Sequence, residues 1–460
     1  MTLKTKRKIV LIGAGSTTFT QRLVADLILS EDASSWELAL VDIDAEVLEV
    51  VTLLVKKMLE AKNSGLKVTS TTDRCEVLPG ADFVVTTIAV GGRRGWETDV
   101  VVPRKYDIYQ PVGDTVMPGG ISRGLRMIPP MVAIAEDIKQ LCPTAYFFNY
   151  SNPMTAVCRA VRKATGVPLI GLCHGVHVAE GYLARFLGVE EGSISTFGVG
   201  LNHLTFLTHV FYKGQDALPM FQEKLNEQRA TLEQEITSKD EFVNWIMGRP
   251  PRYSDDPFTW SFFEQYNVVP LMLDRHASEF FPERFPQGKY YGKRLGIDAF
   301  PIDKRIAWGD DVYLEMKRLA RSSESFPETF FEQVPGEHEQ LLEMMRSLTF
   351  DKRETFSVNM PNEGAVENLP DDAIIEIPAV ATARGFCQVH AGELPDVLAA
   401  MLLKKLSSIE ITVEAALKGD YNLFVEALLA DGAVTDKTTA KNLADDLIKA
   451  HAQHLPQFAA

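Results

Sequence analysis

The chain lacks the features that mark membrane, nucleic-acid-binding and disulfide-stapled proteins. Its 460 residues contain no apolar run near the roughly 20 residues that a membrane helix requires. The formal net charge is −15, so a phosphate-rich partner would be repelled. The five cysteines are an odd, scattered set and do not resemble a disulfide framework. We therefore expect a cytoplasmic protein with reduced thiols and no membrane or nucleic-acid partner.

The N-terminus is basic and then apolar, as in a secretory signal, but it has no small-residue cleavage site. The segment "KIVLI" at residues 8–12, apolar from Ile9 onward, leads straight into a glycine turn, which predicts a first strand instead. A chain of 460 residues exceeds one ordinary core. We expect two domains, at residues 1–195 and 196–460.

The turn after this strand reads "GAGSTTF" and has the character of a phosphate-binding loop. Gly13 and Gly15 permit a tight turn and a close approach of the backbone to a pyrophosphate. The third glycine of the usual G-x-G-x-x-G pattern is absent, because Thr18 stands there. We expect Gly13, Gly15, Ser16 and Thr17 to bind a dinucleotide.

A second expected strand, "WELALVDID", carries Asp42 at its end. An acid at that point can accept hydrogen bonds from the ribose hydroxyls, and it favours NAD because it would repel the 2′-phosphate of NADP. Further strands at 82–92 and 145–154 follow at βαβ spacing. The pattern predicts an α/β fold with an N-terminal Rossmann-type doubly wound sheet, like those of lactate and malate dehydrogenases. A fold that binds another nucleotide, or none, stays open.

Polar side chains follow several of the expected strands, where doubly wound sheets hold their ligands. They are Asn152 in "NYSNPM", Cys173 and His174 in "GLCHGV", and His203 in "GVGLNHLTF", with Asp114 in a glycine-rich loop at 113–126. One thiolate and one imidazole, from Cys173 and His203, would leave a divalent ion with open positions for a substrate. No CxxC or HxxxH pair lies nearby, so a structural zinc site is disfavoured.

A set of motifs in fixed order carries a family resemblance. The motifs are "IGAGST", "LVDID", "ADFVV", "VGG", "GDTVMPGGISRGLR", "NYSNPM", "GLCHG", "LNHLTF" and "VNMPNEGAVENLPDDAIIEIPA". Together they resemble glycoside hydrolase family 4, the NAD-dependent glycosidases. The resemblance implies a redox route: hydride passes from C3 of the sugar to NAD, C2 loses a proton, the aglycone leaves C1, water adds and the hydride returns. It also implies a divalent ion, usually Mn²⁺, and a homodimer or homotetramer.

Carried over to this sequence, the resemblance implies roles for individual residues. Cys173 and His203 become the metal ligands, while Asn152 and Asp114 contact the sugar. His174 stands where the family places the acid that protonates the leaving oxygen, and an imidazole suits that role.

The same resemblance places the base that takes the C2 proton on a tyrosine or an aspartate after a "G/N-x-x-P" stretch. Here "YNVVPLMLDRHASEFF" offers Asp274, with Tyr266 as a neighbouring alternative. Arg275 and His276 follow at once and resemble a basic pair that could bind a sugar carboxylate, although both could be structural.

The substrate class stays open between several alternatives. "CHG" resembles members that act on unphosphorylated α-glycosides, including α-glucuronidases, α-galacturonidases and some α-glucosidases. Members for 6-phospho-sugars usually carry an arginine where Trp96 stands, and Arg93 and Arg94 are out of phase with that position. The alternatives are a 6-phospho-glycosidase, an NAD-dependent hydroxy-acid or sugar dehydrogenase, and a non-catalytic NAD-sensing module.

The C-terminal half has an alternating pattern that predicts an α+β domain. Segments such as "TFLTHVFY" and "AIIEIPAVA" predict strands, and residues 372–395 read as strands joined by a glycine turn. Residues 393–431 predict amphipathic helices, and 213–260 predict solvated helix. We expect the active site in the cleft between the two domains.

Overall fold

The computed structural model describes residues 6–173, 175–231, 251–327, 329–333 and 340–459. The first part of the chain forms a parallel sheet. Its strands lie in the order β3 (Lys67–Thr71), β2 (Trp36–Val41), β1 (Arg7–Ile12), β4 (Phe83–Thr86), β5 (Tyr146–Asn149) and β6 (Leu169–Gly171). The order 3-2-1-4-5-6 is that of doubly wound dinucleotide-binding folds. The predicted fold class is confirmed.

Two of these strands are shorter than expected. β4 stops at Thr86, where 82–92 was predicted, and two left-handed glycines, Gly91 and Gly92, lead into the next helix. β5 stops at Asn149, whose side-chain oxygen accepts a hydrogen bond from the Ser151 amide and closes a turn.

The second part of the chain extends the same sheet with antiparallel strands. They are β7 (Ile194–Leu201), β8 (Leu204–Tyr212), β9 (Gln215–Asp216), β10 (Val269–Pro270), β13 (Glu354–Pro361), β14 (Ile374–Thr382) and β15 (Gly385–Gln388). The two parts join where Asn359 of β13 pairs with Gly171 of β6. A small separate hairpin pairs β11 (Lys289–Tyr290) with β12 (Lys293–Arg294). The sheet thus crosses the boundary expected at residue 195, and the division into two domains stays a prediction.

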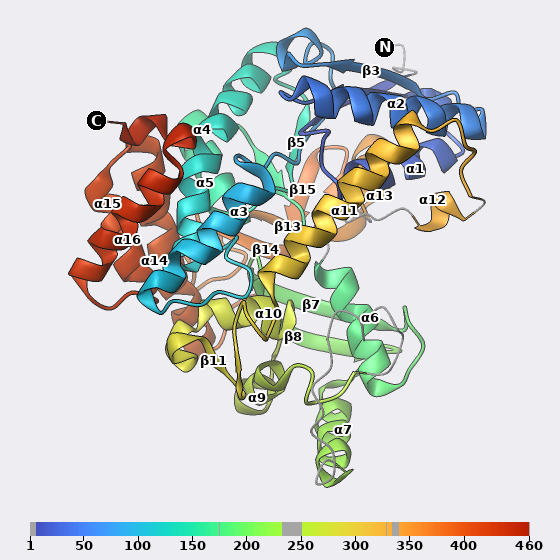
Figure 1. Ribbon diagram of the computed structural model, residues 1–460. Coiled ribbons are helices and arrows are strands. Elements are labelled where there is room, and N and C mark those ends of the chain that lie inside the picture. The colour runs from blue at the N-terminus through green and yellow to red at the C-terminus, as the bar shows by residue number, and fades with distance from the viewer. Residues whose placement is uncertain (1–5, 174, 232–250, 328, 334–339, 460) are drawn as a thin grey trace.

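Helices cover both faces of the sheet (Figure 1). The first series comprises α1 (Thr20–Leu29), α2 (Ala45–Lys62), α3 (Gly92–Val101), α4 (Met117–Leu141), α5 (Met154–Thr165) and α6 (Gly175–Leu187). The middle series comprises α7 (Leu218–Thr231), α9 (Pro257–Tyr266), α10 (Leu273–Ala277), α11 (Ile302–Arg321), α12 (Phe330–Gln333) and α13 (Leu341–Phe350). Helix α11 packs against α2 and α3.

The C-terminal helices α14 (Asp396–Lys418), α15 (Tyr421–Asp431) and α16 (Lys437–Ala450) form a group beside α4 and α5 (Figure 1). The predicted helices at 393–431 are confirmed by α14 and α15, and the predicted strand pair by β14 and β15. Of the region 213–260, residues 232–250 lie outside the described residues. Among the described helices, none is both long and apolar enough to cross a membrane.

Candidate active site

The glycine turn after β1 lies against the end of β4. Gly13 has a φ of 95°, and a Cβ there would lie 2.8 Å from the backbone carbonyl carbon of Thr87. Ser16 is half-buried and Thr17 is buried, and both belong to a short turn that precedes α1. The helix begins at Thr20, four residues later than an immediate start after Gly15. Without side chains at Gly13 and Gly15, the backbone of this turn can approach a pyrophosphate closely.

Asp42 at the end of β2 faces this turn. One of its carboxylate oxygens accepts a hydrogen bond from the Gly15 amide at 2.8 Å, and the other accepts from the Asp44 amide at 3.0 Å. A Cβ at Gly15 would lie 2.8 Å from the Asp42 carboxylate and 2.3 Å from the Val47 side chain. The structure therefore brings Asp42 and the glycine turn together, while ribose binding by Asp42 stays a prediction.

A second glycine-rich loop leads into α4 and carries Asp114. Gly113 has a φ of 67° and Met117, the first residue of α4, a φ of 59°. A Cβ at Gly120 would lie 2.3 Å from the carbonyl carbon of Thr115, so the loop folds back onto the first turn of the helix. The glycine at position 120 of "GDTVMPGG" thus leaves room for the Thr115 carbonyl, and this close packing fixes the loop that carries Asp114.

Asp114, His203 and His276 come together from three distant segments. Each offers one ligand atom, and these atoms lie within 4.8 Å of one another. The centroids of the two imidazole rings are 4.0 Å apart, and His203 Nδ1 lies 3.9 Å from a carboxylate oxygen of Asp114. One carboxylate and two imidazoles are a donor set that a first-row divalent ion accepts. His203 was expected in a metal site, and the structure adds two residues that were expected to contact substrate.

His203 occupies a strained backbone position. It forms, with Asn202, the two-residue turn between β7 and β8, and its φ is 72°. Few residues other than glycine adopt this conformation, although histidine does so more often than most. Such strain clusters at functional sites. The turn holds the buried His203 ring toward Asp114 and His276.

Asn152 belongs to the same network. Its side-chain amide donates to a carboxylate oxygen of Asp114 at 3.0 Å, and its backbone carbonyl accepts from the Arg123 guanidinium at 3.0 Å. The loop after β5 and the loop before α4 are thereby joined. The two residues expected to contact the sugar, Asn152 and Asp114, do lie side by side.

Cys173 is half-buried where β6 ends. A Cβ at Gly175 would lie 3.5 Å from the Cys173 sulfur and 2.4 Å from the sulfur of Met272. This strand end therefore packs beside the residues that lead into α10, the helix of His276. Cys173 is not one of the three clustered residues, and its role as a metal ligand stays a prediction. His174 lies outside the described residues.

Asp274 was expected to be the C2 base, which stays a prediction, and the structure gives its carboxylate structural contacts. The carboxylate is fully buried and accepts hydrogen bonds from the amides of Phe258 at 2.8 Å and Thr259 at 2.6 Å, and from the Tyr290 hydroxyl. These amides belong to the first turn of α9, so Asp274 caps that helix. Burial raises its pKa, and the hydrogen bonds from Tyr290 and Thr259 oppose the rise. Because both oxygens are engaged and the side chain is buried, these contacts favour a structural role for the carboxylate over a role as base.

Tyr266, the alternative base, is also engaged elsewhere. Its hydroxyl accepts a hydrogen bond from Arg284 at 3.0 Å, and its ring packs against Phe262 at a centroid distance of 4.5 Å.

The sequence reasoning missed Glu279. Its fully buried carboxyl accepts hydrogen bonds from the amides of Val112 at 2.9 Å and Gly113 at 2.5 Å. Burial and the nearby negative charge of Asp114 raise its pKa to about 8, while the two amides and Arg275 act in the opposite direction. Glu279 thus anchors the start of the Asp114 loop. No local motif could have shown this, because the amides that it binds lie 166 and 167 residues away.

The basic residues near the "VGG" motif are already paired. The Arg93 guanidinium lies 2.7 Å from the Asp310 carboxylate on α11, and Arg94 contacts the same carboxylate. Arg94 also pairs with Glu97 at 2.8 Å. The Trp96 indole donates to the Val112 carbonyl at 2.6 Å. These contacts disfavour phosphate recognition by Arg93 and Arg94.

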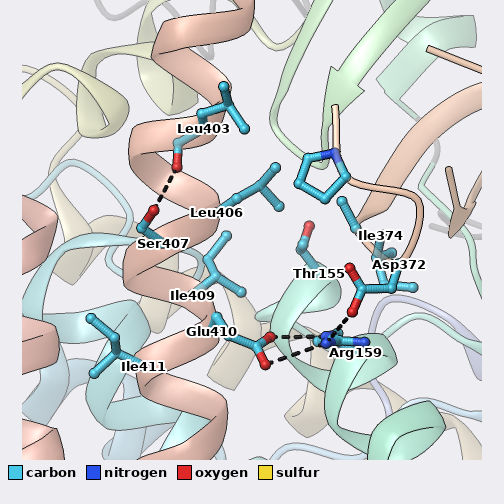
Figure 2. A pocket seen from close by; sticks show the side chains of 12 residues that line it. Thr155, Arg159, Asp372, Ile374, Leu403, Leu406, Ser407, Ile409, Glu410 and Ile411 are labelled. Carbon is cyan, nitrogen blue, oxygen red and sulfur yellow. Dashed lines mark hydrogen bonds and ion pairs between the residues drawn. The ribbon is translucent and has the colours of Figure 1, made fainter. Parts of the chain in front are cut away.

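A cavity of about 480 Å³ lies elsewhere, between α5, α14 and residues 370–374 (Figure 2). Arg159 points into it and pairs with Glu410 at 2.8 Å and with Asp372 at 2.5 Å. None of the clustered residues lines this cavity. The size of this cavity is therefore no reason to place the active site there.

Comparison with known proteins gives one family for both parts of the chain. Residues 8–189 match the model described as family 4 glycosyl hydrolase, and residues 198–434 match the C-terminal domain of that family.

Relatives match over nearly the whole chain, and a solved structure shares its fold. An α-galactosidase of Bacillus subtilis is 28% identical, covering 98% of this chain and 100% of its own. An α-galacturonidase of Thermoanaerobacterium saccharolyticum is 31% identical, covering 93% and 91%. A solved 6-phospho-α-glucosidase from gut microorganisms, in complex with NAD and Mn²⁺, has a TM-score of 0.80 at 22% identity, covering 98% and 99%. The chain belongs to glycosyl hydrolase family 4.

Proposed function

We propose that this glycosidase depends on NAD and a divalent metal ion and acts on unphosphorylated α-hexosides or hexuronides. The observation that carries the proposal is the cluster of Asp114, His203 and His276 beside Asn152. It stands at the carboxyl edge of the sheet whose first strands carry the glycine turn and Asp42. That edge is where doubly wound sheets bind ligands.

The residues present fit both groups. The bare backbone at Gly13 and the carboxylate of Asp42 suit a dinucleotide, and the carboxylate and imidazoles of the cluster suit a divalent ion. When bound, NAD would supply the hydride acceptor and the ion would polarise sugar oxygens. Support comes from the solved relative described with NAD and Mn²⁺.

The chain's own residues divide the remaining work. The Asn152 amide and the Asp114 carboxylate orient sugar hydroxyls, and His174 donates a proton to the leaving oxygen. Two assignments are possible for His276. In the first, His276 ligates the metal together with Asp114 and His203. In the second, Cys173 and His203 hold the ion, and the His276 imidazole takes the C2 proton.

The pairing of the basic residues supports the proposed substrate class. Arg93 and Arg94 are engaged by Asp310, which disfavours a 6-phospho-sugar. Arg275 adjoins His276 and is half-buried, so its guanidinium could receive a sugar carboxylate. The names of the two curated relatives, α-galactosidase and α-galacturonidase, support neutral and acidic hexosides alike.

The testing experiment is a panel of aryl glycosides with NAD⁺, Mn²⁺ and a reducing agent. The panel holds glucuronide, galacturonide, glucoside, galactoside and 6-phosphoglucoside, each as α and β anomer. We expect aglycone release from an unphosphorylated α-glycoside without net NADH accumulation, and deuterium at C2 of sugar released in D₂O. Stoichiometric NADH would favour the dehydrogenase alternative, and cleavage confined to the 6-phosphoglucoside would overturn the substrate class.

We further propose a homodimer or homotetramer, as the family resemblance implies, and a cytoplasmic location, as the odd, scattered set of cysteines suggests. Light scattering of the purified protein would give the oligomeric state directly.

A further inference from the structure

The Thr115 hydroxyl lies between two residues of the metal cluster. Its oxygen is 2.6 Å from Oδ1 of Asp114 and 2.7 Å from Nδ1 of His203. Both distances are those of hydrogen bonds, and the contacts are shielded because Thr115 and His203 are 7% and 5% exposed. A hydroxyl has one hydrogen to donate, so the two bonds must differ in direction.

The partners decide that direction. An ionised carboxylate can only accept, and the other oxygen of Asp114 already accepts from the Asn152 amide. The Thr115 hydroxyl must therefore donate to Asp114. If it donated to His203 instead, two oxygen lone pairs would face each other at 2.6 Å with no hydrogen between them. The Thr115 oxygen is consequently the acceptor toward His203, and Nδ1 of His203 carries the hydrogen.

The hydroxyl cannot easily turn away, because its loop is held at several points. Glu279 accepts from the Gly113 amide on one side, and the Met117 amide donates to Asp431 at 3.2 Å on the other. Gly120 packs against the Thr115 carbonyl. Threonine is also branched at Cβ, which restricts χ1.

We propose that Thr115 is a positioning residue that fixes His203 in the tautomer with hydrogen on Nδ1, so that Nε2 is the nitrogen that binds the metal ion. In a neutral imidazole only one ring nitrogen has a lone pair in the ring plane, and the hydrogen bond of the other nitrogen selects it. A series of hydrogen bonds, Asn152–Asp114–Thr115–His203, thus links a residue proposed to contact the sugar to a proposed metal ligand. The metal part of this inference rests on the proposed function, whereas the tautomer does not.

The experiment compares three variants with the wild type. Thr115→Val removes the hydroxyl and keeps the shape, and Thr115→Ser restores the hydroxyl. Thr412→Val is the matched control, because it removes another buried hydroxyl that lines the same small cavity as Thr115. The Thr412 side chain is 3% exposed, and its hydroxyl donates to the Ser408 carbonyl. Thermal unfolding of all four proteins checks that they fold.

The first measurement is the ¹⁵N spectrum of histidine-labelled, metal-free protein, in which protonated and unprotonated ring nitrogens have distinct shifts. The His203 signals are those lost in His203→Ala. We expect hydrogen on Nδ1 in the wild type, in Thr115→Ser and in Thr412→Val, and a mixture of tautomers in Thr115→Val. Hydrogen on Nε2 in the wild type would overturn the proposal without any variant.

The second measurement is Mn²⁺ affinity, from the electron paramagnetic resonance signal of the free ion. Loss of an outer partner of a metal-binding histidine typically weakens affinity by about 10- to 100-fold, so we expect that loss in Thr115→Val. Thr115→Ser and Thr412→Val should stay near the wild type. Equal affinity in Thr115→Val and the wild type would contradict the inference. A wild type that binds no Mn²⁺ would instead overturn the proposed metal site, and the nitrogen spectrum would still decide the tautomer.

Discussion

The dinucleotide turn and the metal cluster lie at the same edge of the sheet but are built in opposite ways. The turn is local: Gly13 and Gly15 follow β1, Asp42 follows β2, the Gly15 amide donates to Asp42, and the Gly13 amide donates to the Val41 carbonyl. The cluster is assembled from Asp114, His203 and His276, which lie on two loops and the short helix α10, far apart in the chain. Short-range sequence patterns therefore predicted the turn, but they predicted only part of the cluster.

The largest effect should come from removing His203, which the sequence predicts to be a metal ligand and which lies in the cluster with Asp114 and His276. His203→Ala should weaken Mn²⁺ binding by more than about 100-fold, because even an outer partner of such a ligand contributes 10- to 100-fold. NAD binding, measured by calorimetry, should be unchanged if the two regions are independent. A parallel loss of NAD affinity would break the comparison.

The same titration separates the two candidate ligand sets. His276→Ala should weaken Mn²⁺ binding if the structural cluster is the site, and Cys173→Ser should weaken it if the set predicted from sequence is correct. We expect losses in both variants, with the loss in His276→Ala at least about tenfold. Normal metal affinity in His276→Ala, together with loss of deuterium exchange at C2, would assign the base role to His276.

Asp42→Ala tests the other region. It removes the acceptor for the ribose hydroxyls, and hydrogen bonds to a charged group contribute about 1.5–3 kcal/mol, so NAD should bind about 10- to 100-fold more weakly. The variant should also discriminate less against NADP. Asp42→Asn, which keeps an acceptor for the Gly15 amide, controls for collapse of the turn. Equal binding of NAD and NADP by the wild type would count against the role of Asp42.

A third change probes the packing of the Asp114 loop. Gly120→Ala should destabilise the protein by about 1–3 kcal/mol, because the new methyl group would overlap the Thr115 carbonyl. Gly181→Ala is the matched control, since this helical glycine has only side-chain atoms at 3.4 Å or more near its missing Cβ. That control should be neutral or stabilise by up to about 1 kcal/mol. Similar unfolding midpoints for both variants would show that the close approach at Gly120 is not needed.

The smallest effect concerns Glu279, which anchors the same loop. Its pKa is raised to about 8 from a usual value of 4.5, so the folded state holds the proton more tightly than the unfolded chain. Its contribution to stability is therefore full below pH 4.5 and is lost as the pH rises through about 8. As the pH rises from 4.5 to about 8, the melting temperature of the metal-free wild type should fall by a few degrees relative to that of Glu279→Gln. A pH-independent difference would argue against a protonated Glu279.

Elements were predicted correctly where the residues that determine them lie close together in the chain. Strands β1 and β2, the glycine turn and the helices α14 and α15 were predicted because apolar periodicity and turn residues are local signals. The structural contacts of Asp274 were not predicted, for the opposite reason. Its carboxylate is one residue away from Arg275 and two from His276 in sequence, but burial and the amides of α9 give it a structural role that no nearby residue reveals.

By itself, the sequence determined the doubly wound fold, the order of the motifs and thereby the family, and the residue types available for chemistry. Only the tertiary structure decided which of those residues meet. It joined Asp114 to His203 through the Thr115 hydroxyl, brought His276 to the same point, and placed Glu279 behind the loop. The physical reason is that a strand or turn is selected by its own residues, whereas the role of a buried polar group depends on donors, charges and solvent exclusion supplied by distant segments.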